Sequence, residues 1–145
     1  IAAQATMVDS LFYVMVLSQP SKDLWIEFLE NLDDEYYLQL AIDKRNSLLF
    51  EEAQSIDSAA VYLEFTENYP DAKDFVKAKK LYETRVFEEK TGNKSIKSYQ
   101  DFISEYPKSP YRPQAEQAVY KLSTDSGSVE DYASFIRQNT RNPIV

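Results

Sequence analysis

The sequence contains no cysteine and no histidine. Without cysteine the chain forms no disulfide, no catalytic thiolate and no thiolate zinc site. Without histidine it lacks the usual general base at neutral pH, every Ser-His-Asp arrangement and the commonest zinc ligand. Catalysis would have to rest on carboxylate, lysine, tyrosine or serine side chains. We therefore expect a protein that is not an enzyme and that needs no metal or other cofactor.

Glycine is also scarce, with two residues in a chain of 145. Tight hairpins and phosphate-binding loops both depend on glycine, so sheet-rich folds and nucleotide-binding loops are disfavoured. The hydrophobic content of 43% and the aromatic content of 14% are sufficient for a folded core. These features together predict an all-α protein.

Long apolar runs and excess positive charge are missing as well. The longest run, Leu11–Leu17, has seven residues, whereas a membrane-spanning helix needs roughly 20. Asp9 before this run and Gln19-Pro20 after it are untypical of a signal peptide. A net charge of −8 and an isoelectric point near 4.6 disfavour a nucleic-acid partner. We expect neither a transmembrane segment nor nucleic-acid binding, and we expect the chain to be part of a longer polypeptide.

What the sequence does contain is an internal repeat of 37 residues. Placed on itself at this offset, the chain aligns aromatic, acidic and small residues in three consecutive copies. The aligned sets are Trp25, Tyr62 and Tyr99; Phe28, Phe65 and Phe102; Glu27, Glu64 and Asp101; Ala41, Ala78 and Ala115; and Tyr13, Phe50 and Phe87. A fourth copy begins at Tyr132 and Phe135 after a deletion of four residues. Periods of this length are typical of helical solenoids, whose units bury their apolar faces against each other.

Each repeat is predicted to contain two helices. An aromatic pair spaced i, i+3 lies on one face of a helix, and the Tyr-Pro pair that follows ends that helix. Ser109-Pro110 is then expected to open the second helix as its N-cap and first residue, with Asp71 and Asn142 in similar roles. Gly92 and Gly127 fall between repeats, where a left-handed residue ends a helix. Ser128 with Asp131 is typical of a capping box.

The predicted helices group into one helical-repeat domain covering residues 1–145. Its repeats lie near 21–57, 58–94 and 95–127, with half-units at 1–20 and 128–145. The helices are expected near 3–17, 21–31, 36–52, 56–68, 73–89, 95–105, 111–123 and 128–138.

The segment Tyr99–Ala115, which reads YQDFISEYPKSPYRPQA, resembles the tetratricopeptide-like repeats of bacterial cell-envelope proteins, including outer-membrane assembly lipoproteins. The resemblance covers nearly the whole chain and implies a right-handed α-α superhelix, with a period longer than the 34 residues of the consensus. It also implies a periplasmic or cell-envelope location, with a cytoplasmic one as the alternative, and possible membrane association through flanking sequence.

The resemblance further implies that the second helix of each pair lines a concave groove. Carried over position by position, the groove contains Leu40, Asp43, Ser47, Lys77, Lys80, Thr84, Gln114, Gln117 and Lys121. The partner-binding candidates among them are Asp43, Lys77, Lys80, Gln114, Gln117 and Lys121. The alternative is that these are ordinary solvated helix faces. The acidic row formed by Glu27, Glu64 and Asp101 is a further candidate for docking, although a solvated outer face explains it equally simply.

Three motifs resemble known sites and are given structural explanations. Asp125-Ser126-Gly127 has the letters of an aspartic-protease motif, but it occurs once and without strand patterns. Gly92–Ser95 imitates the end of a phosphate-binding loop with the wrong spacing. Asp33–Glu35 lacks the spaced ligands of a calcium loop, whereas acids at a helix start complement the helix dipole.

The sequence thus predicts a non-catalytic scaffold that binds a protein or a peptide, most simply an acidic or extended segment. Two alternatives stay open. One is a structural spacer or oligomerisation segment, and the other is a carboxylate-based hydrolase, which would need two convergent buried acids.

Overall fold

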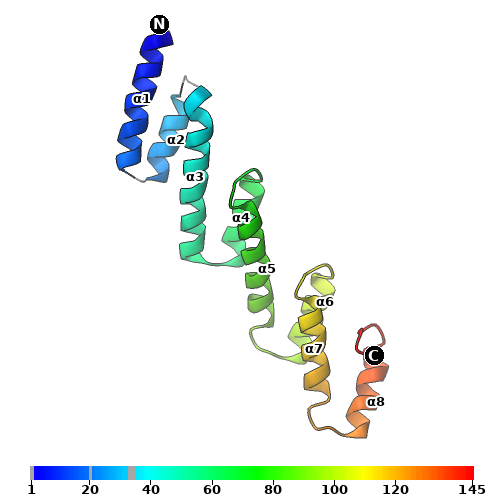
Figure 1. The fold of residues 1–145 in the computed structure, drawn as a ribbon. Coiled ribbons are helices and arrows are strands. Elements are labelled where there is room, and N and C mark those ends of the chain that lie inside the picture. Colours follow the sequence, from blue (N-terminus) through cyan, green and yellow to red (C-terminus); the bar gives the residue numbers. More distant parts are fainter. Residues whose placement is uncertain (1, 20, 33–34) are drawn as a thin grey trace. The chain divides into compact units, whose positions relative to one another are not determined.

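The computed structural model describes residues 2–19, 21–32 and 35–145, with side chains for all of these except 2–6 and 8. The described residues form eight α-helices and no strand, which confirms the all-α prediction for this part of the chain (Figure 1). The helices are α1 (Ala2–Ser18), α2 (Lys22–Glu30), α3 (Glu35–Ile56), α4 (Ala59–Asn68), α5 (Phe75–Thr91), α6 (Ile96–Glu105), α7 (Arg112–Ser123) and α8 (Val129–Gln138).

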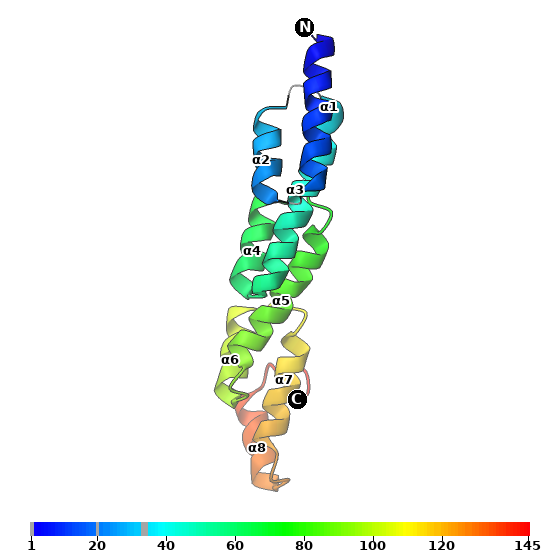
Figure 2. The ribbon, with the colours of Figure 1, turned by 90° about the vertical axis from the view of Figure 1, so that its left-hand side faces the viewer.

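The chain divides into two compact units, residues 1–81 and 82–145, with the boundary inside α5. In the first unit α2 packs on α1 and α3, and α3 packs on α4. In the second unit α7 packs on both α6 and α8. These pairs of consecutive helices lie side by side, as Figure 1 and Figure 2 both show for α2 with α3 and for α6 with α7.

Aromatic side chains from the repeat build the core of the first unit. Trp25 and Phe28 are fully buried together with Val16 of α1 and Ala41 of α3. Tyr13 meets the indole ring of Trp25 edge to face at 5.7 Å, a favoured arrangement for aromatic pairs. The small Ala41 side chain lets α3 approach the rings closely, which explains why alanine recurs at this repeat position.

The second unit uses the equivalent residues in the same way. Phe102 is buried and meets Phe87 edge to face at 5.1 Å, and Phe135 meets Tyr120 at 5.2 Å. The predicted aromatic core is thus confirmed for most members of the series. Two members are less buried: Tyr99 is half-buried, and Tyr132 is 41% exposed.

The turn that joins the two helices of a repeat recurs three times with the same backbone hydrogen bonds. In the first copy, Tyr69 donates to Phe65 at 2.9 Å, Ala72 to Tyr69 at 3.1 Å and Phe75 to Ala72 at 3.0 Å. The equivalent amides after Phe102 and after Phe135 make the same three bonds, at 2.8–3.1 Å. The repeat in the sequence is therefore also a repeat in backbone geometry.

This turn corrects the expected start of α7. Ser109 is not its N-cap, because the helix begins at Arg112 with Tyr111 as N-cap and Pro113 in its first turn. The Ser109 hydroxyl instead accepts a bond from the Tyr111 amide at 3.2 Å. Asp71 likewise lies too far ahead of Phe75 to cap α5. At the equivalent place after α8, the Asn142 side-chain oxygen accepts a bond from the Ile144 amide.

The junction between repeats recurs as well, and it corrects one glycine prediction. Asp57, Lys94 and Gly127 occupy equivalent positions and have left-handed φ angles of 54°, 52° and 68°. A serine N-cap follows each of them. Gly127 is thus left-handed as expected, whereas at the preceding junction the left-handed residue is Lys94 rather than Gly92.

Candidate binding surface

Three of the predicted partner-binding residues lie together on α7. Gln114, Gln117 and Lys121 are exposed and are spaced three and four residues apart, so they share one face of the helix. They line a cavity of about 620 Å³ in the second unit. The other residues of its wall are Phe87, Tyr99, Pro110, Pro113 and Ala118.

Aromatic contacts fix the wall of this cavity. Phe87 of α5 stacks on Tyr111 with ring centres 5.0 Å apart and planes 13° apart. The Tyr111 hydroxyl lies 2.7 Å from the hydroxyl of Thr84. The Tyr99 ring lies 6.3 Å from that of Phe87. The cavity therefore has a preorganised apolar wall beside the polar face of α7.

The chemistry of this surface suits an extended polypeptide. Gln114 and Gln117 each carry an amide that can both donate and accept a hydrogen bond, as a peptide backbone requires. The Lys121 ammonium can pair with a carboxylate. Within the described structure none of these three side chains makes a hydrogen bond or an ion pair, so their polar groups face solvent.

The two predicted lysines of α5 lie in the other unit, before the boundary inside that helix. Lys77 and Lys80 are both exposed. The Lys77 ammonium lies over the ring of Phe50, 5.0 Å from its centre, so a cation–π contact already engages it.

Asp43 also belongs to the first unit, where it makes structural contacts. Its carboxylate pairs with Lys73 and accepts a hydrogen bond from Gln39 at 2.8 Å. The bond from Lys73, together with the one from Gln39, holds the pKa of Asp43 below its usual range. Ser47 donates to the Asp43 carbonyl at 2.9 Å, and Leu40 is exposed.

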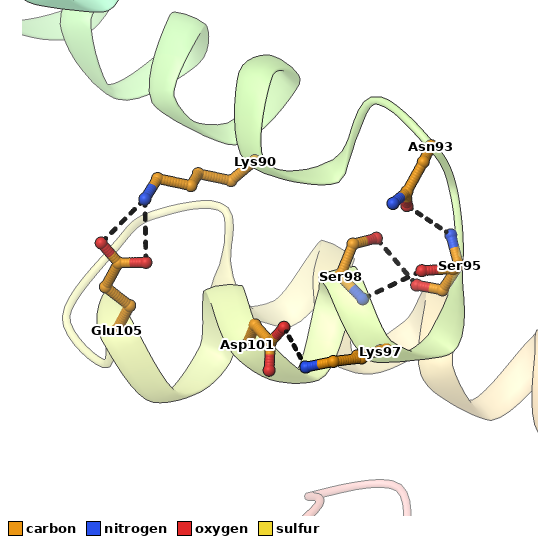
Figure 3. A network of polar contacts seen from close by, with 7 residues as sticks. All are labelled: Lys90, Asn93, Ser95, Lys97, Ser98, Asp101 and Glu105. Atoms are coloured by element: carbon orange, nitrogen blue, oxygen red, sulfur yellow. Dashed lines mark hydrogen bonds and ion pairs between the residues drawn. The ribbon is translucent and has the colours of Figure 1, made fainter.

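The acidic row is solvent-facing, and one of its members joins a polar network in the second unit (Figure 3). Asp101 pairs with Lys97 at 2.7 Å. In the same network the Lys90 ammonium binds both oxygens of Glu105, at 2.9 and 3.0 Å, which connects α5 to α6. Its bond to Glu105 raises the pKa of Lys90, and the same bond lowers the pKa of Glu105. Glu27 and Glu64 are exposed.

The motifs that resemble catalytic or metal sites have structural roles where the structure describes them. Ser126 bonds to Asp131 and accepts the Ser128 amide at 3.2 Å, while Ser128 accepts the Asp131 amide at 3.1 Å. Ser128 therefore caps α8 as predicted, but the reciprocal bond of a capping box is replaced: the Ser128 amide donates to Ser126, and the Asp131 carboxylate bonds to Ser126 instead. Gly92–Ser95 is a turn between α5 and α6.

Asp33 and Asp34 lie outside the described residues. Within the described residues, no group of three or more acidic side chains is placed to hold a metal ion. The two carboxylates that are buried, Asp9 and Glu116, belong to different units. None of the described helices combines the length and the apolar character that crossing a membrane requires.

Sequence reasoning missed the apolar half of the α7 cavity. Tyr99 was expected in the core as a member of the repeated aromatic series, whereas the structure shows it half-buried and lining the cavity together with the buried Phe87. Tyr99 lies on α6, the helix directly before α7, whereas Phe87 lies on α5, two helices before it, so only Tyr99 offered a local signal. Comparison of the chain with family models, with curated proteins and with solved structures found no match.

Proposed function

We propose that this chain is a non-catalytic, tetratricopeptide-like scaffold that binds an extended or acidic segment of another protein. One observation carries the proposal. Gln114, Gln117 and Lys121 present uncommitted polar groups on one face of α7, beside a wall built from Phe87 and Tyr99. An amide-rich face next to a fixed aromatic wall suits an extended chain that offers both backbone polar groups and side chains.

The repeated turns and junctions support the finer fold proposal, a right-handed superhelix of tetratricopeptide-like units. Identical connections between successive helix pairs rotate each pair by a similar amount, which produces a superhelix. Small-angle scattering of the full chain tests this, since a superhelical array gives an elongated profile and a globular bundle does not.

The binding proposal is tested with a peptide library screened against the full chain. We expect acidic or extended peptides to be captured, and Lys121→Glu to weaken capture through the association rate and its salt dependence. The matched control is Lys97→Glu, which places the same charge reversal on the outer face of α6. Equal binding by both variants would show that the α7 face is not the site.

The lysines of α5, which belong to the first unit, are proposed as a further partner-binding position. Reversing Lys77 and Lys80 to glutamate should also weaken capture, whereas reversing Glu27 and Glu64 to lysine should have little effect. If the second variant loses the partner and the first keeps it, binding belongs to the acidic row.

A bacterial cell-envelope location is proposed together with this function, and the cytoplasm is the alternative. Fractionation of the source cells with an antibody against the chain separates the two, because envelope and cytoplasmic fractions carry different marker proteins.

An oligomerisation segment is the second candidate function, and α1 favours it. Met7, Leu11 and Val14 lie on one face of this helix and are all more than half exposed. Contiguous exposed apolar surface of this kind marks interaction sites. Light scattering after size exclusion, at rising concentration, should show association that Leu11→Glu abolishes. A monomer at every concentration would exclude this candidate.

A further inference from the structure

A second cavity of about 500 Å³ lies on the other side of α7. Arg112, Glu116 and Val119 contribute to its wall and are spaced four and three residues apart, so they form a face distinct from that of Gln114 and Gln117. Side chains from α6 and from the turn after α8 complete it. Its volume falls within the range of pockets that enclose small molecules or a few residues of a peptide.

One guanidinium in this cavity is held in place by a buried acid. Glu116 is 5% exposed and accepts a hydrogen bond from Nε of Arg112 at 2.8 Å. Nη1 of the same arginine donates to the carbonyl of Pro107 at 3.2 Å. Within the described structure Nη2 has no protein partner. Two fixed bonds therefore orient the guanidinium and leave one of its nitrogens available.

A second guanidinium comes from the turn that follows α8. The Asn142 amide donates to the Asn139 carbonyl at 2.8 Å, and the Asn142 side chain donates to the Glu116 carbonyl at 3.2 Å. These bonds attach the turn to α7 and place Arg141 in the cavity wall. Arg141 is exposed and has no ion pair with any described residue.

The charges in the cavity select the ligand. Two arginines face one carboxylate, so the site carries one net positive charge within a chain of net charge −8. A planar guanidinium matches a carboxylate in two-point geometry. A single positive charge balances a monoanionic carboxylate better than a phosphate, which carries close to two negative charges. Gln100 and Gln138 add amides beside the guanidinium groups.

We propose that this cavity binds a carboxylate group through Arg112 and Arg141, with the glutamine amides contacting the polar group next to it. The carboxylate can come from a free organic acid or from an acidic peptide. This site is separate from the face carrying Lys121, so it goes beyond the proposed scaffold function and does not depend on it.

Calorimetric titration of the full chain tests the site with two monoanionic probes, glutaramate (the monoamide of glutaric acid) and a capped pentapeptide containing one glutamate. Their neutral counterparts are glutaramide and the same peptide with glutamine. We expect a carboxylate probe to bind at least about tenfold more tightly than its amide, because a charged acceptor strengthens a hydrogen bond. Binding of glutaramate indicates free acids, and binding of the peptide alone indicates an acidic segment. Equal binding of acid and amide, tighter binding of inorganic phosphate, or no binding would overturn the proposal.

Two variants locate the binding. Arg141→Gln should weaken the carboxylate probe about tenfold or more, whereas Lys108→Gln, at the equivalent repeat position outside this cavity, should not. Arg112→Lys keeps the charge next to Glu116 but loses the oriented Nη2 donor, so it should also weaken binding while the melting temperature stays close to that of the parent. Lys121→Glu should leave this probe unaffected, which separates the site from the α7 face. Equal effects of Arg141→Gln and Lys108→Gln would contradict the assignment.

Discussion

Among the side chains that the structure describes in the first unit, two buried polar atoms have no hydrogen-bond partner. They are Oδ2 of Asp9 and Nε1 of Trp25. Asp9 is 3% exposed, and an unpaired polar atom at such depth loses its bonds to water without replacement.

Asp9→Asn is therefore expected to raise the free energy of unfolding by about 1 kcal/mol or more, because the amide carries no charge to desolvate. Urea denaturation measures the change. The same substitution at the exposed Asp125 serves as the control and should alter stability by less than about 0.5 kcal/mol. Destabilisation by Asp9→Asn would show that the carboxylate has a favourable role.

Phe102 is one of the large, fully buried side chains of the second unit. It is 1% exposed and contacts the rings of Phe87 and Tyr106. Phe102→Ala should lower the free energy of unfolding by about 3–5 kcal/mol, as is usual for a buried aromatic residue. Tyr132→Ala, at an exposed position of the same series, should cost clearly less. The two variants are compared by their melting temperatures. If the Phe102 variant melts close to the parent, the alignment of the repeats that places Phe102 in the core is wrong.

At the scale of an element, the junctions between repeats show how the residue type sets the energetic cost of a left-handed backbone conformation. A left-handed residue other than glycine costs roughly 1–2 kcal/mol, and alanine regains about 0.4–1 kcal/mol by restricting the unfolded chain. No atom lies within 4 Å of a Cβ added to Gly127. A side chain at this position meets no clash, so a substitution changes the stability only through the backbone conformation.

Gly127→Ala should accordingly lower stability by about 0.5–1 kcal/mol in urea denaturation. Lys94→Gly, at the equivalent position, relieves backbone strain in the folded state but raises the conformational entropy of the unfolded chain. Because the two effects oppose each other, the free energy of unfolding should change by less than about 0.5 kcal/mol. A stabilising Gly127→Ala would mean that the junction tolerates a different backbone geometry.

The ion pair between Asp43 and Lys73 joins α3 to the turn before α5 and gives this connection a pH dependence. The pKa of Asp43 is lowered in the folded state, so the unfolded chain takes up the proton at higher pH than the folded chain does. The stability from the pair is fully present above the ordinary aspartate pKa of about 3.9. It is lost as the pH falls through the lower folded value.

Asp43→Asn should remove this part of the acid sensitivity, so the melting temperature of the variant should fall less steeply than that of the parent below about pH 4. Asp71→Asn, in the exposed turn before α5, is the control and should follow the parent curve. Parallel curves for the Asp43 variant and the parent would argue against the ion pair.

Most elements were predictable because the repeat supplies the same signals several times. Six helices begin and end within two residues of their predicted limits. The exceptions adjoin the junction before Ser58, where α3 continues to Ile56 and α4 starts at Ala59. Gly92 was assigned the left-handed conformation because glycine is the residue best suited to it, yet the bonding of the junction places that conformation at Lys94.

For the whole molecule, charge dominates the expected solution behaviour. The chain carries −8 at neutral pH and reaches zero net charge near pH 4.6. Loss of net charge favours association, and Leu11, 61% exposed, lies on the apolar face of α1.

We expect particle size, measured by dynamic light scattering, to rise sharply near the isoelectric point. Leu11→Glu should reduce this rise, whereas Val129→Glu on α8 should reduce it less, because Val129 lies outside the α1 face. Constant particle size across this pH range would show that the α1 face does not drive association.

The candidate sites were less predictable than the helices, because cavities depend on distances between elements. The positions of Gln114, Gln117 and Lys121 on α7 followed from helical periodicity, but their aromatic neighbours depended on how α5 and α6 pack on that helix. The pairing of Arg112 with Glu116 can be expected from their spacing. The approach of Arg141 depends on a turn closed by Asn142, a contact with no local signal.

The recurring joint between repeats also has a genetic consequence. At 57–58 and again at 94–95, a left-handed residue precedes a serine that begins the next helix. An unequal crossover between these two places in the gene would join Lys94 to Ser58, or Asp57 to Ser95, and so add or remove one whole period. Either product keeps a left-handed residue before a capping serine and leaves every helix intact. Recombination can therefore change the length of such a gene in steps of 37 codons.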